Sequence, residues 1–172
     1  MITATPLTVR LARDTDNLRR LTPNKAGLDR SVYDVALVAT RDDVIAGFVG
    51  LVLLSPMRKG SPRTGLVRLE VWSDGTRHSI ERHLLTALIE IVTKREDVER
   101  LRLGVDDAGK AASEMYQSLG FEVHGVYGLD SPTIVLEREL LPTQRDALIR
   151  RLKFGDAPER RHGRTRKTLQ AA

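Results

Sequence analysis

Apolar and polar residues alternate along several short segments of the chain, with the period of two that is typical of half-buried β-strands. The pattern starts at residues 7–11. Two longer apolar runs, 35–39 and 44–54, are separated by Arg41-Asp42-Asp43, which predicts a hairpin. Gly47 and Gly50 lie inside the second run and indicate a bulge or a close approach of the backbone. Further strands are predicted at residues 66–72, 101–105, 121–127 and 133–140.

Helices are marked by apolar residues spaced three or four apart. The clearest helix runs from about Ser79 to Arg95, and Asp14 or Thr15 caps a shorter one that ends before Pro23. Residues 24–33 form either a connection or a second short helix. Asp106 or Asp107 is the expected N-cap of a later helix, which Gly120 ends in a left-handed conformation. Its apolar face carries Ala112, Met115, Tyr116 and Leu119.

The order of these elements predicts a mixed α/β domain over residues 1–140, with one βαβ unit at its centre. Residues 55–64, which contain two prolines and a glycine, are expected to form a loop. Residues 141–172 form a basic extension, in which a helix over 143–153 precedes an Arg-rich tail. We expect this tail to be disordered because it is poor in apolar residues.

Composition adds mainly exclusions. A chain of 172 residues with 41% hydrophobic residues suits one globular domain. The absence of cysteine excludes disulfides and thiolate zinc sites, and with only four histidines we expect no metal site. No stretch approaches the roughly 20 apolar residues that cross a bilayer. Residues 1–6 lack the features of a signal peptide, so the cytoplasm is the simplest location.

The net charge of +5 resides in the extension, where residues 141–172 hold nine Lys or Arg and three acidic residues. The rest of the chain is close to neutral. This tail predicts weak, non-specific, salt-sensitive binding of polyanions at most. Phe154 is its only aromatic residue, so stacking on nucleic-acid bases is not supported.

One segment carries a resemblance to a known family. It reads Val105-Asp-Asp-Ala-Gly-Lys-Ala-Ala-Ser-Glu-Met-Tyr-Gln-Ser-Leu-Gly-Phe121. Together with the preceding strand and long helix, it resembles the GNAT superfamily of acetyl-CoA-dependent N-acetyltransferases over roughly residues 7–140. The best matches are Ala112, Tyr116, Gly120 and Phe121. The resemblance implies the GNAT acyl-CoA N-acyltransferase fold, a central mixed, mostly antiparallel sheet flanked by helices.

The resemblance implies acetyl-CoA as co-substrate, bound between the fourth strand and the long helix. The family's diphosphate loop, Gln/Arg-x-x-Gly-x-Gly/Ala, falls on Thr76 to Glu81, and every signature position has changed. Glycines and helix N-termini suit phosphate because free N–H groups can approach it. Gly109 replaces an asparagine of the family. The candidate cofactor-binding residues are Leu69, Val71, Thr76, Arg77, His78, Ser79, Ile80, Arg82 and Gly109.

Glu81 is the departure with the largest expected effect. A carboxylate about 4 Å from a phosphate charge costs roughly 1 kcal/mol in water and about 4 kcal/mol at an effective dielectric of 20. Arg77, His78 and Arg82 would offset this repulsion by pairing with phosphate from the flanks. Alternatively, Glu81 is simply a favourable first-turn acid and the arginines are solvated.

Catalysis in this family needs a base for the amine and an acid for the leaving thiolate. The resemblance places the acid on Tyr116, whose position on an apolar stripe is equally compatible with a core residue. The carboxylate that many relatives use as base falls on Val67 here. Glu70 is the nearest substitute, although the period of two turns it to the opposite sheet face. Asp74 or His124, acting through water, is a further alternative.

These residues lead to two hypotheses. The first is an acyl-CoA-dependent N-acyltransferase that moves an acetyl group directly to a primary amine of a small molecule or a protein. The alternative is a catalytically degenerate binding or regulatory protein with weak or no acetyl-CoA binding, suggested by Thr76, Ser79, Glu81 and Val67. The resemblance also leaves room for a homodimer, since related folds often pair through terminal strands.

Overall fold

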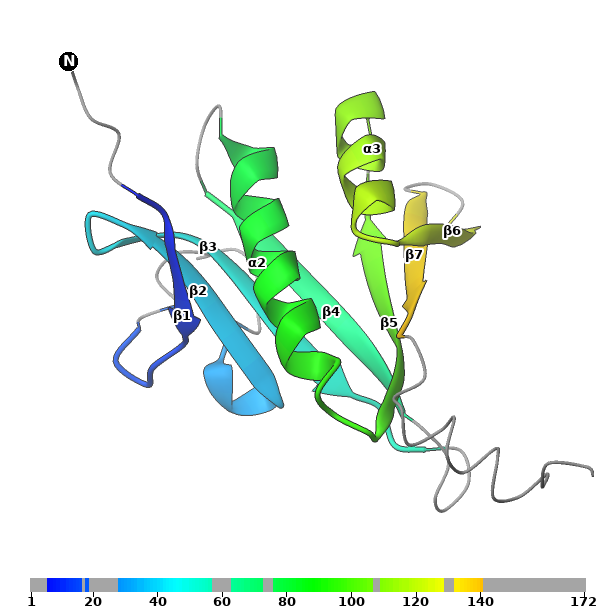
Figure 1. Ribbon diagram of the computed structural model, residues 1–172, viewed down its shortest axis with the longest axis horizontal. Coiled ribbons are helices and arrows are strands. Elements are labelled where there is room, and N and C mark those ends of the chain that lie inside the picture. Colours follow the sequence, from blue (N-terminus) through cyan, green and yellow to red (C-terminus); the bar gives the residue numbers. More distant parts are fainter. Residues whose placement is uncertain are drawn as a thin grey trace, which may run out of the picture. The chain divides into compact units, whose positions relative to one another are not determined.

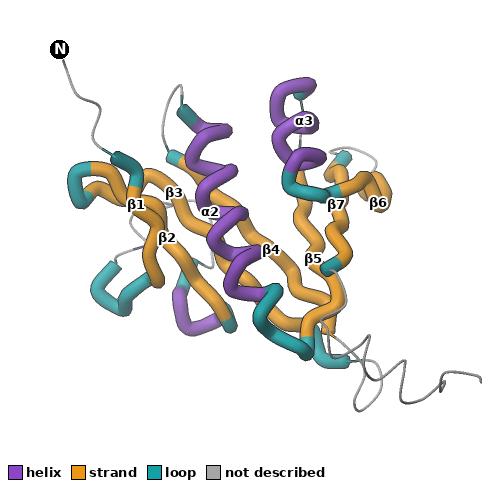
Figure 2. The backbone as a smooth tube through the Cα atoms, in the orientation of Figure 1, coloured by secondary structure: helices purple, strands orange, loops and turns teal. Residues whose placement is uncertain are grey.

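A computed structural model describes residues 6–16, 18, 28–56, 63–72, 76–106, 109–128 and 132–140. They form one seven-stranded sheet with helices α2 and α3 on the same face (Figures 1 and 2). The predicted mixed, mostly antiparallel sheet flanked by helices is confirmed. Its elements are β1 (Thr8–Leu11), the 3₁₀ turn η1 (Arg30–Val32), β2 (Val35–Arg41), β3 (Val44–Leu53), β4 (Arg63–Val71), α2 (Arg77–Val92), β5 (Val98–Val105), α3 (Lys110–Ser118), β6 (Glu122–Tyr127) and β7 (Thr133–Glu139).

The strand order is β1-β2-β3-β4-β5-β7-β6. All neighbouring strands are antiparallel except β4 and β5, which are parallel and connected through α2. This pair is the βαβ unit predicted at the centre of the domain. Parallel neighbours require such a crossover because the chain must return to the same end of the sheet.

The predicted hairpin joins β2 to β3 through Asp42 and Asp43, both with positive φ (50° and 61°). Two such residues match the twist of antiparallel strands. Pairing shifts between Ala39 and Thr40, opposite Gly47, so the bulge is confirmed. The close approach is confirmed as well, because a Cβ on Gly47 would lie 2.8 Å from Ile80 Cγ2.

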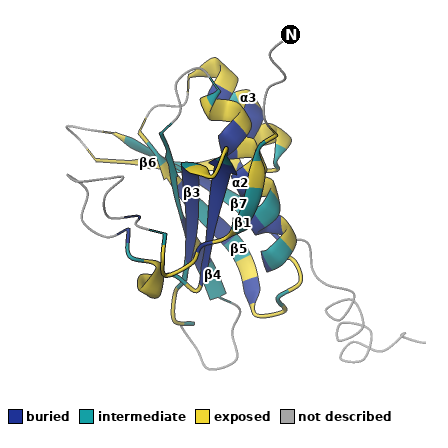
Figure 3. Cartoon of the chain, turned by 90° about the vertical axis from the view of Figure 1, so that its left-hand side faces the viewer, coloured by how far each residue is buried: buried dark blue, intermediate teal, exposed yellow. Residues whose placement is uncertain are grey.

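Two clusters of buried apolar residues lie on opposite faces of the sheet. Figure 3 marks the buried residues of the central strands in dark blue. The larger cluster lies between the sheet and the helices and contains most of the apolar stripe of α2. The smaller cluster covers the other face of β2 and β3. It contains Ala12, Leu18, Leu28, Ala36, Val38 and Phe48.

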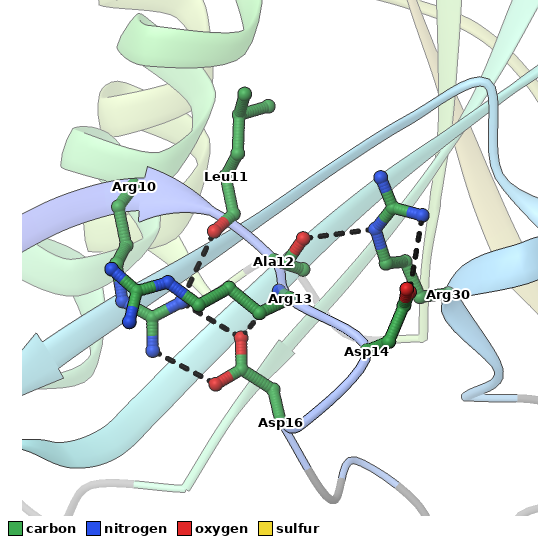
Figure 4. Close-up of polar contacts among 7 residues, drawn as sticks. All are labelled: Arg10, Leu11, Ala12, Arg13, Asp14, Asp16 and Arg30. Carbon is green, nitrogen blue, oxygen red and sulfur yellow. Dashed lines mark hydrogen bonds and ion pairs between the residues drawn. The ribbon is translucent and has the colours of Figure 1, made fainter.

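A polar cluster fixes the segment after β1 (Figure 4). Two nitrogens of Arg10 each donate to a carboxylate oxygen of Asp16 at 2.8 Å, and the backbone N–H of Arg13 donates to the same carboxylate at 2.7 Å. Arg30 Nε donates to the carbonyl of Ala12 at 2.9 Å. These contacts hold the chain beside η1, on the side of the sheet opposite α2.

The ends of two helices differ from the prediction. Helix α2 begins at Arg77 rather than Ser79, because the carbonyl of Thr76 accepts hydrogen bonds from the N–H groups of Ser79 and Ile80. The N-cap of α3 is Gly109, so Asp106 is not the cap. The other candidate cap, Asp107, lies outside the described residues, as do 19–27, 57–62 and 141–172.

The short helix predicted after Asp14, most of the loop at 55–64 and the whole basic extension therefore remain predictions. At residues 24–33 the described part is the 3₁₀ turn at Arg30–Val32. In the part of the chain that the structure describes, no helix is long and apolar enough to cross a bilayer.

Candidate active site

Strands β4 and β5 separate towards their C-terminal ends (Figure 1). Their last paired positions are Val67 and Leu103, although β4 continues to Val71 and β5 to Val105. The backbone of residues 68–71 therefore has β3 on one side and, among the strands that the structure describes, none on the other. A polar strand edge inside a domain needs a partner, which makes this gap a natural place for a ligand.

The gap opens into a crevice with a volume of about 840 Å³, which is within the range of small-molecule sites. Both catalytic candidates line it, as do Leu69, Arg77, His78 and Gly109 of the predicted cofactor set. Its walls come from four regions of the chain: Val67, Arg68, Leu69 and Glu70; Arg77, His78 and Glu81; Leu103, Gly104, Val105 and Asp106; and Gly109, Lys110, Ala111, Ala112 and Tyr116.

The remaining predicted cofactor residues do not line the crevice. Ile80 is fully buried in the core, and Val71 packs against that core. Ser79 and Arg82 are exposed on α2, and Thr76 is its N-cap. Thr76 and Ser79 thus occupy the first turn of α2, beside the crevice rather than in its wall.

Glu81 is buried, with 2% of its surface exposed. One carboxylate oxygen accepts a hydrogen bond from Arg77 Nε at 2.8 Å, and the other lies 3.0 Å from His78 Nδ1. The hydrogen bond to Glu81 raises the pKa of Arg77, against the opposing effect of burial. Two side chains expected to pair with phosphate therefore pair with a carboxylate of the same helix.

Tyr116 belongs to the core and also lines the crevice, so the two interpretations of its position are compatible. It is 5% exposed, and its ring meets Phe121 edge-on with centroids 6.4 Å apart. Burial and, secondarily, the negative charge of Glu81 raise the pKa of Tyr116 to about 12. The hydroxyl therefore keeps its proton throughout the neutral range.

Glu70 lies on the face of β4 opposite α2, as the period of two predicts. It pairs with Phe48 of β3, and its carboxylate is 3.5 Å from Arg68 Nη2. The register between β3 and β4 is continuous there, so no bulge reorients Glu70. Glu70 is nevertheless one of the residues that line the crevice.

The other base candidates differ in position. His124 lies on β6, where its Nε2 is 3.3 Å from Arg102 Nη2, and it borders a separate hollow. Asp74 lies outside the described residues. Val67, at the position of the family's carboxylate, lines the crevice as a buried apolar residue.

Sequence reasoning missed three charged residues of the crevice wall: Arg68, Asp106 and Lys110. Arg68 is two residues from Glu70 on the same strand face, so period-two alternation could have found it. Asp106 and Lys110 flank the start of α3, and they become neighbours of the crevice only because β5 diverges from β4.

Comparisons with known proteins address the family and the fold. A model described as the acetyltransferase (GNAT) family matches residues 10–121. An acetyltransferase of the GNAT family from Streptococcus pneumoniae superimposes with a TM-score of 0.62 at 19% identity, covering 78% of this chain and 99% of that structure. A ribosomal-protein-alanine N-acetyltransferase from Brucella melitensis gives a TM-score of 0.57 at 22% identity, with coverages of 77% and 99%.

A third solved structure is Naa50 of Arabidopsis thaliana in complex with the bisubstrate analogue CoA-Ac-MVNAL. It gives a TM-score of 0.59 at 16% identity and covers 77% of this chain and 97% of that one. A search of curated protein sequences finds no significant match.

Proposed function

Because the chain belongs to the acetyltransferase (GNAT) family, we propose that it moves an acetyl group from acetyl-CoA to a primary amine by direct transfer, without a covalent enzyme intermediate. The observation that carries this proposal is the crevice between β4 and β5, whose wall includes the buried and protonated Tyr116. The acceptor would be a small-molecule amine or an amine of a protein.

Tyr116 is the proposed general acid. As the C–N bond forms and the thioester C–S bond breaks, the sulfur leaves with an electron pair and needs a proton. The Tyr116 hydroxyl, which is protonated at neutral pH, supplies it, although burial makes it a weaker acid than an ordinary tyrosine. The tyrosinate that results regains a proton from solvent before the next turnover.

Glu70 is the proposed general base. Glu70 lines the crevice and belongs to the sheet face opposite α2, so an amine that enters from that face would meet its carboxylate. It would accept the proton that the amine loses on becoming an amide. The contact with Arg68 keeps the carboxylate in place.

The residues of the crevice fit acetyl-CoA only in part. The apolar wall formed by Leu69, Leu103 and Val105, together with the unpaired edge of β4, suits an extended arm with amide groups. The diphosphate does not fit in the same way, because Arg77 and His78 are held by Glu81. The proposed chemistry therefore depends on the arm and not on the diphosphate.

A steady-state assay tests this function: release of free CoA thiol is followed over a panel of primary amines. Tyr116→Phe should lower kcat by about 10²–10⁴-fold, the usual contribution of a general acid, with a small change in KM. Tyr127→Phe is the matched control, because Tyr127 is exposed on β6. Equal activity of Tyr116→Phe and the native chain would contradict the assignment.

The second candidate function is a GNAT-fold binding or regulatory protein that has lost the chemistry. The observation that favours it is the buried Glu81 carboxylate in the crevice wall. If the native protein releases no thiol with any amine and shows no heat of acetyl-CoA binding, only this second candidate function remains.

A further inference from the structure

We propose that Glu81 is a specificity-determining residue of the donor site: its carboxylate holds the Arg77 guanidinium and the His78 ring, the two side chains that would pair with a diphosphate, so thioester donors ending at pantetheine serve about as well as full acyl-CoA. This inference rests on the function proposed above. It names the class of donor, which is any acyl-pantetheine thioester whether or not a nucleotide is attached.

The burial of Glu81 explains why Arg77 and His78 stay paired with its carboxylate. Its side chain is 3% exposed, whereas those of Arg77 and His78 are 67% and 50% exposed. The two surface residues thus reach inward to a buried carboxylate. Moving Arg77 to a ligand would leave that charge with one partner fewer, and a buried unpaired charge is costly.

The positions of Arg77 and Glu81 along α2 are not those that the stability of the helix alone would favour. Arg77 and Glu81 are four residues apart, but the cation stands N-terminal to the acid, which is the less favourable order on a helix. Arg77 also lies at the positive end of the helix dipole. The residue order disfavours the pair and the dipole disfavours Arg77 at this end of the helix, so the position of Arg77 reflects the demand of the buried Glu81 carboxylate.

The crevice as a whole offers no excess of positive charge. Apart from His78, the described residues that line it include three Lys or Arg and three acidic residues. The first turn of α2 is also partly satisfied, because Ser79 and Ile80 donate their N–H groups to the carbonyl of Thr76. A ligand with several phosphate charges would gain little attraction here, while the uncharged arm is unaffected. The balancing residues are Arg68, Arg77 and Lys110 against Glu70, Glu81 and Asp106.

The test compares two donors, acetyl-CoA and acetyl-pantetheine, by kcat/KM and by calorimetric binding of CoA and of pantetheine. In the native chain the two donors should differ by less than about tenfold. Glu81→Gln keeps the shape and removes the charge, so it should raise CoA affinity at least about tenfold, equivalent to about 1.4 kcal/mol, and leave pantetheine affinity unchanged. The matched control is Glu90→Gln, an exposed acid on the same helix.

A double-mutant cycle shows whether Arg77 is the residue that Glu81 keeps from pairing with the diphosphate of CoA. Arg77→Gln should change CoA affinity less than about threefold in the native chain and reduce it at least about tenfold in the Glu81→Gln background. Glu81→Gly is the second variant if Glu81→Gln does not give a native circular dichroism spectrum.

Three outcomes decide the matter. A native chain that already prefers acetyl-CoA by a hundredfold overturns the inference, as does a Glu81 variant with unchanged CoA affinity. A loss of CoA affinity on Arg77→Gln alone has the same consequence. If no variant binds or uses either donor, the proposed function fails together with the inference, whereas binding without turnover contradicts the function only.

Discussion

At the scale of single residues, the site differs most from expectation at Glu81. The sequence shows an acid where the family has a small residue, and it therefore predicts repulsion of phosphate. It does not reveal that the carboxylate is buried and paired, because that depends on where α2 begins. With the helix starting at Arg77, the two side chains fall one turn apart and on the same side.

Tyr116 allows a prediction about alkaline stability. Its pKa is about 12 in the fold against 10.0 for an ordinary tyrosine, so the folded state binds its proton more tightly than the unfolded state does. Stability from this group is present in full below pH 10 and is lost as the pH rises towards 12. The loss should reach about 2–3 kcal/mol.

Urea unfolding between pH 8 and 11.5 measures this loss, and Tyr116→Phe should show a shallower decline than the native chain. Tyr127→Phe, exposed on β6, should retain the native slope. Identical slopes for Tyr116→Phe and the native chain would show that the tyrosine titrates normally.

At the scale of elements, periodicity predicted all seven strands and both of the described helices, with ends shifted by a few residues. The shifts have local causes. The Thr76 carbonyl extends α2 backwards, and α3 begins only after Gly109. Capping hydrogen bonds of this kind involve single backbone groups, which leave no periodic signal in a sequence.

Gly47 lies where β3 comes close to α2, and it gives a prediction for packing. An added Cβ would lie 2.8 Å from Ile80 Cγ2 and 3.0 Å from Leu84 Cδ1, both in fully buried side chains. Gly47→Ala should lower the free energy of unfolding by about 1–3 kcal/mol, the usual cost of overpacking. Urea denaturation measures it.

Gly109→Ala is the comparison for this variant, since a Cβ there meets no atom within 4 Å. Its cost should stay below about 1 kcal/mol, arising from the N-cap alone. Equal losses at both glycines would mean that α2 shifts away from β3 to admit the methyl group.

At the scale of the whole molecule, the strand order and the crevice were accessible only through the family resemblance. Hydrophobic periodicity says which segments are strands, but the pairing of β4 with β5 and the end of that pairing after Val67 depend on contacts between distant segments. For the same reason, the meeting of Glu70 with Tyr116 in one crevice could not be read from the spacing of either residue.

Several paired carboxylates predict how the fold responds to acid. Hydrogen bonds from Arg10 and Arg95 lower the pKa values of Asp16 and Asp97 below the ordinary 3.8. Burial alone would raise the pKa of Glu137, but Arg102 and the other cations around it outweigh burial and lower the pKa below 4.5. Stability from these groups is complete above pH 4.5 and is lost as the pH falls further.

Asp16→Asn should remove about 1–3 kcal/mol at pH 7 and make the acid-induced loss smaller than in the native chain. Unfolding in urea at pH 7, 5, 4 and 3 measures both effects. Glu114→Gln is the control, because the Glu114 side chain is 65% exposed. A native-like acid profile for Asp16→Asn would show that this carboxylate contributes nothing to the pH dependence.

The basic extension predicts a second property of the whole chain. Deleting residues 155–172 removes five Lys or Arg and two acidic residues, so retention on heparin or DNA at low salt should fall sharply. Elution salt on a heparin column measures it, and CoA release by the truncated chain should stay the same. Unchanged retention would place any polyanion binding in the remaining residues.

The separation of β4 from β5 has a consequence for self-association. An unpaired strand edge normally invites the sheet of another molecule and, with it, aggregation. Here the unpaired edge of residues 68–71 faces a crevice whose walls include residues of α2 and α3. The walls of the crevice thereby shield this strand edge from the sheets of neighbouring proteins, while a ligand inside the crevice can still pair with it.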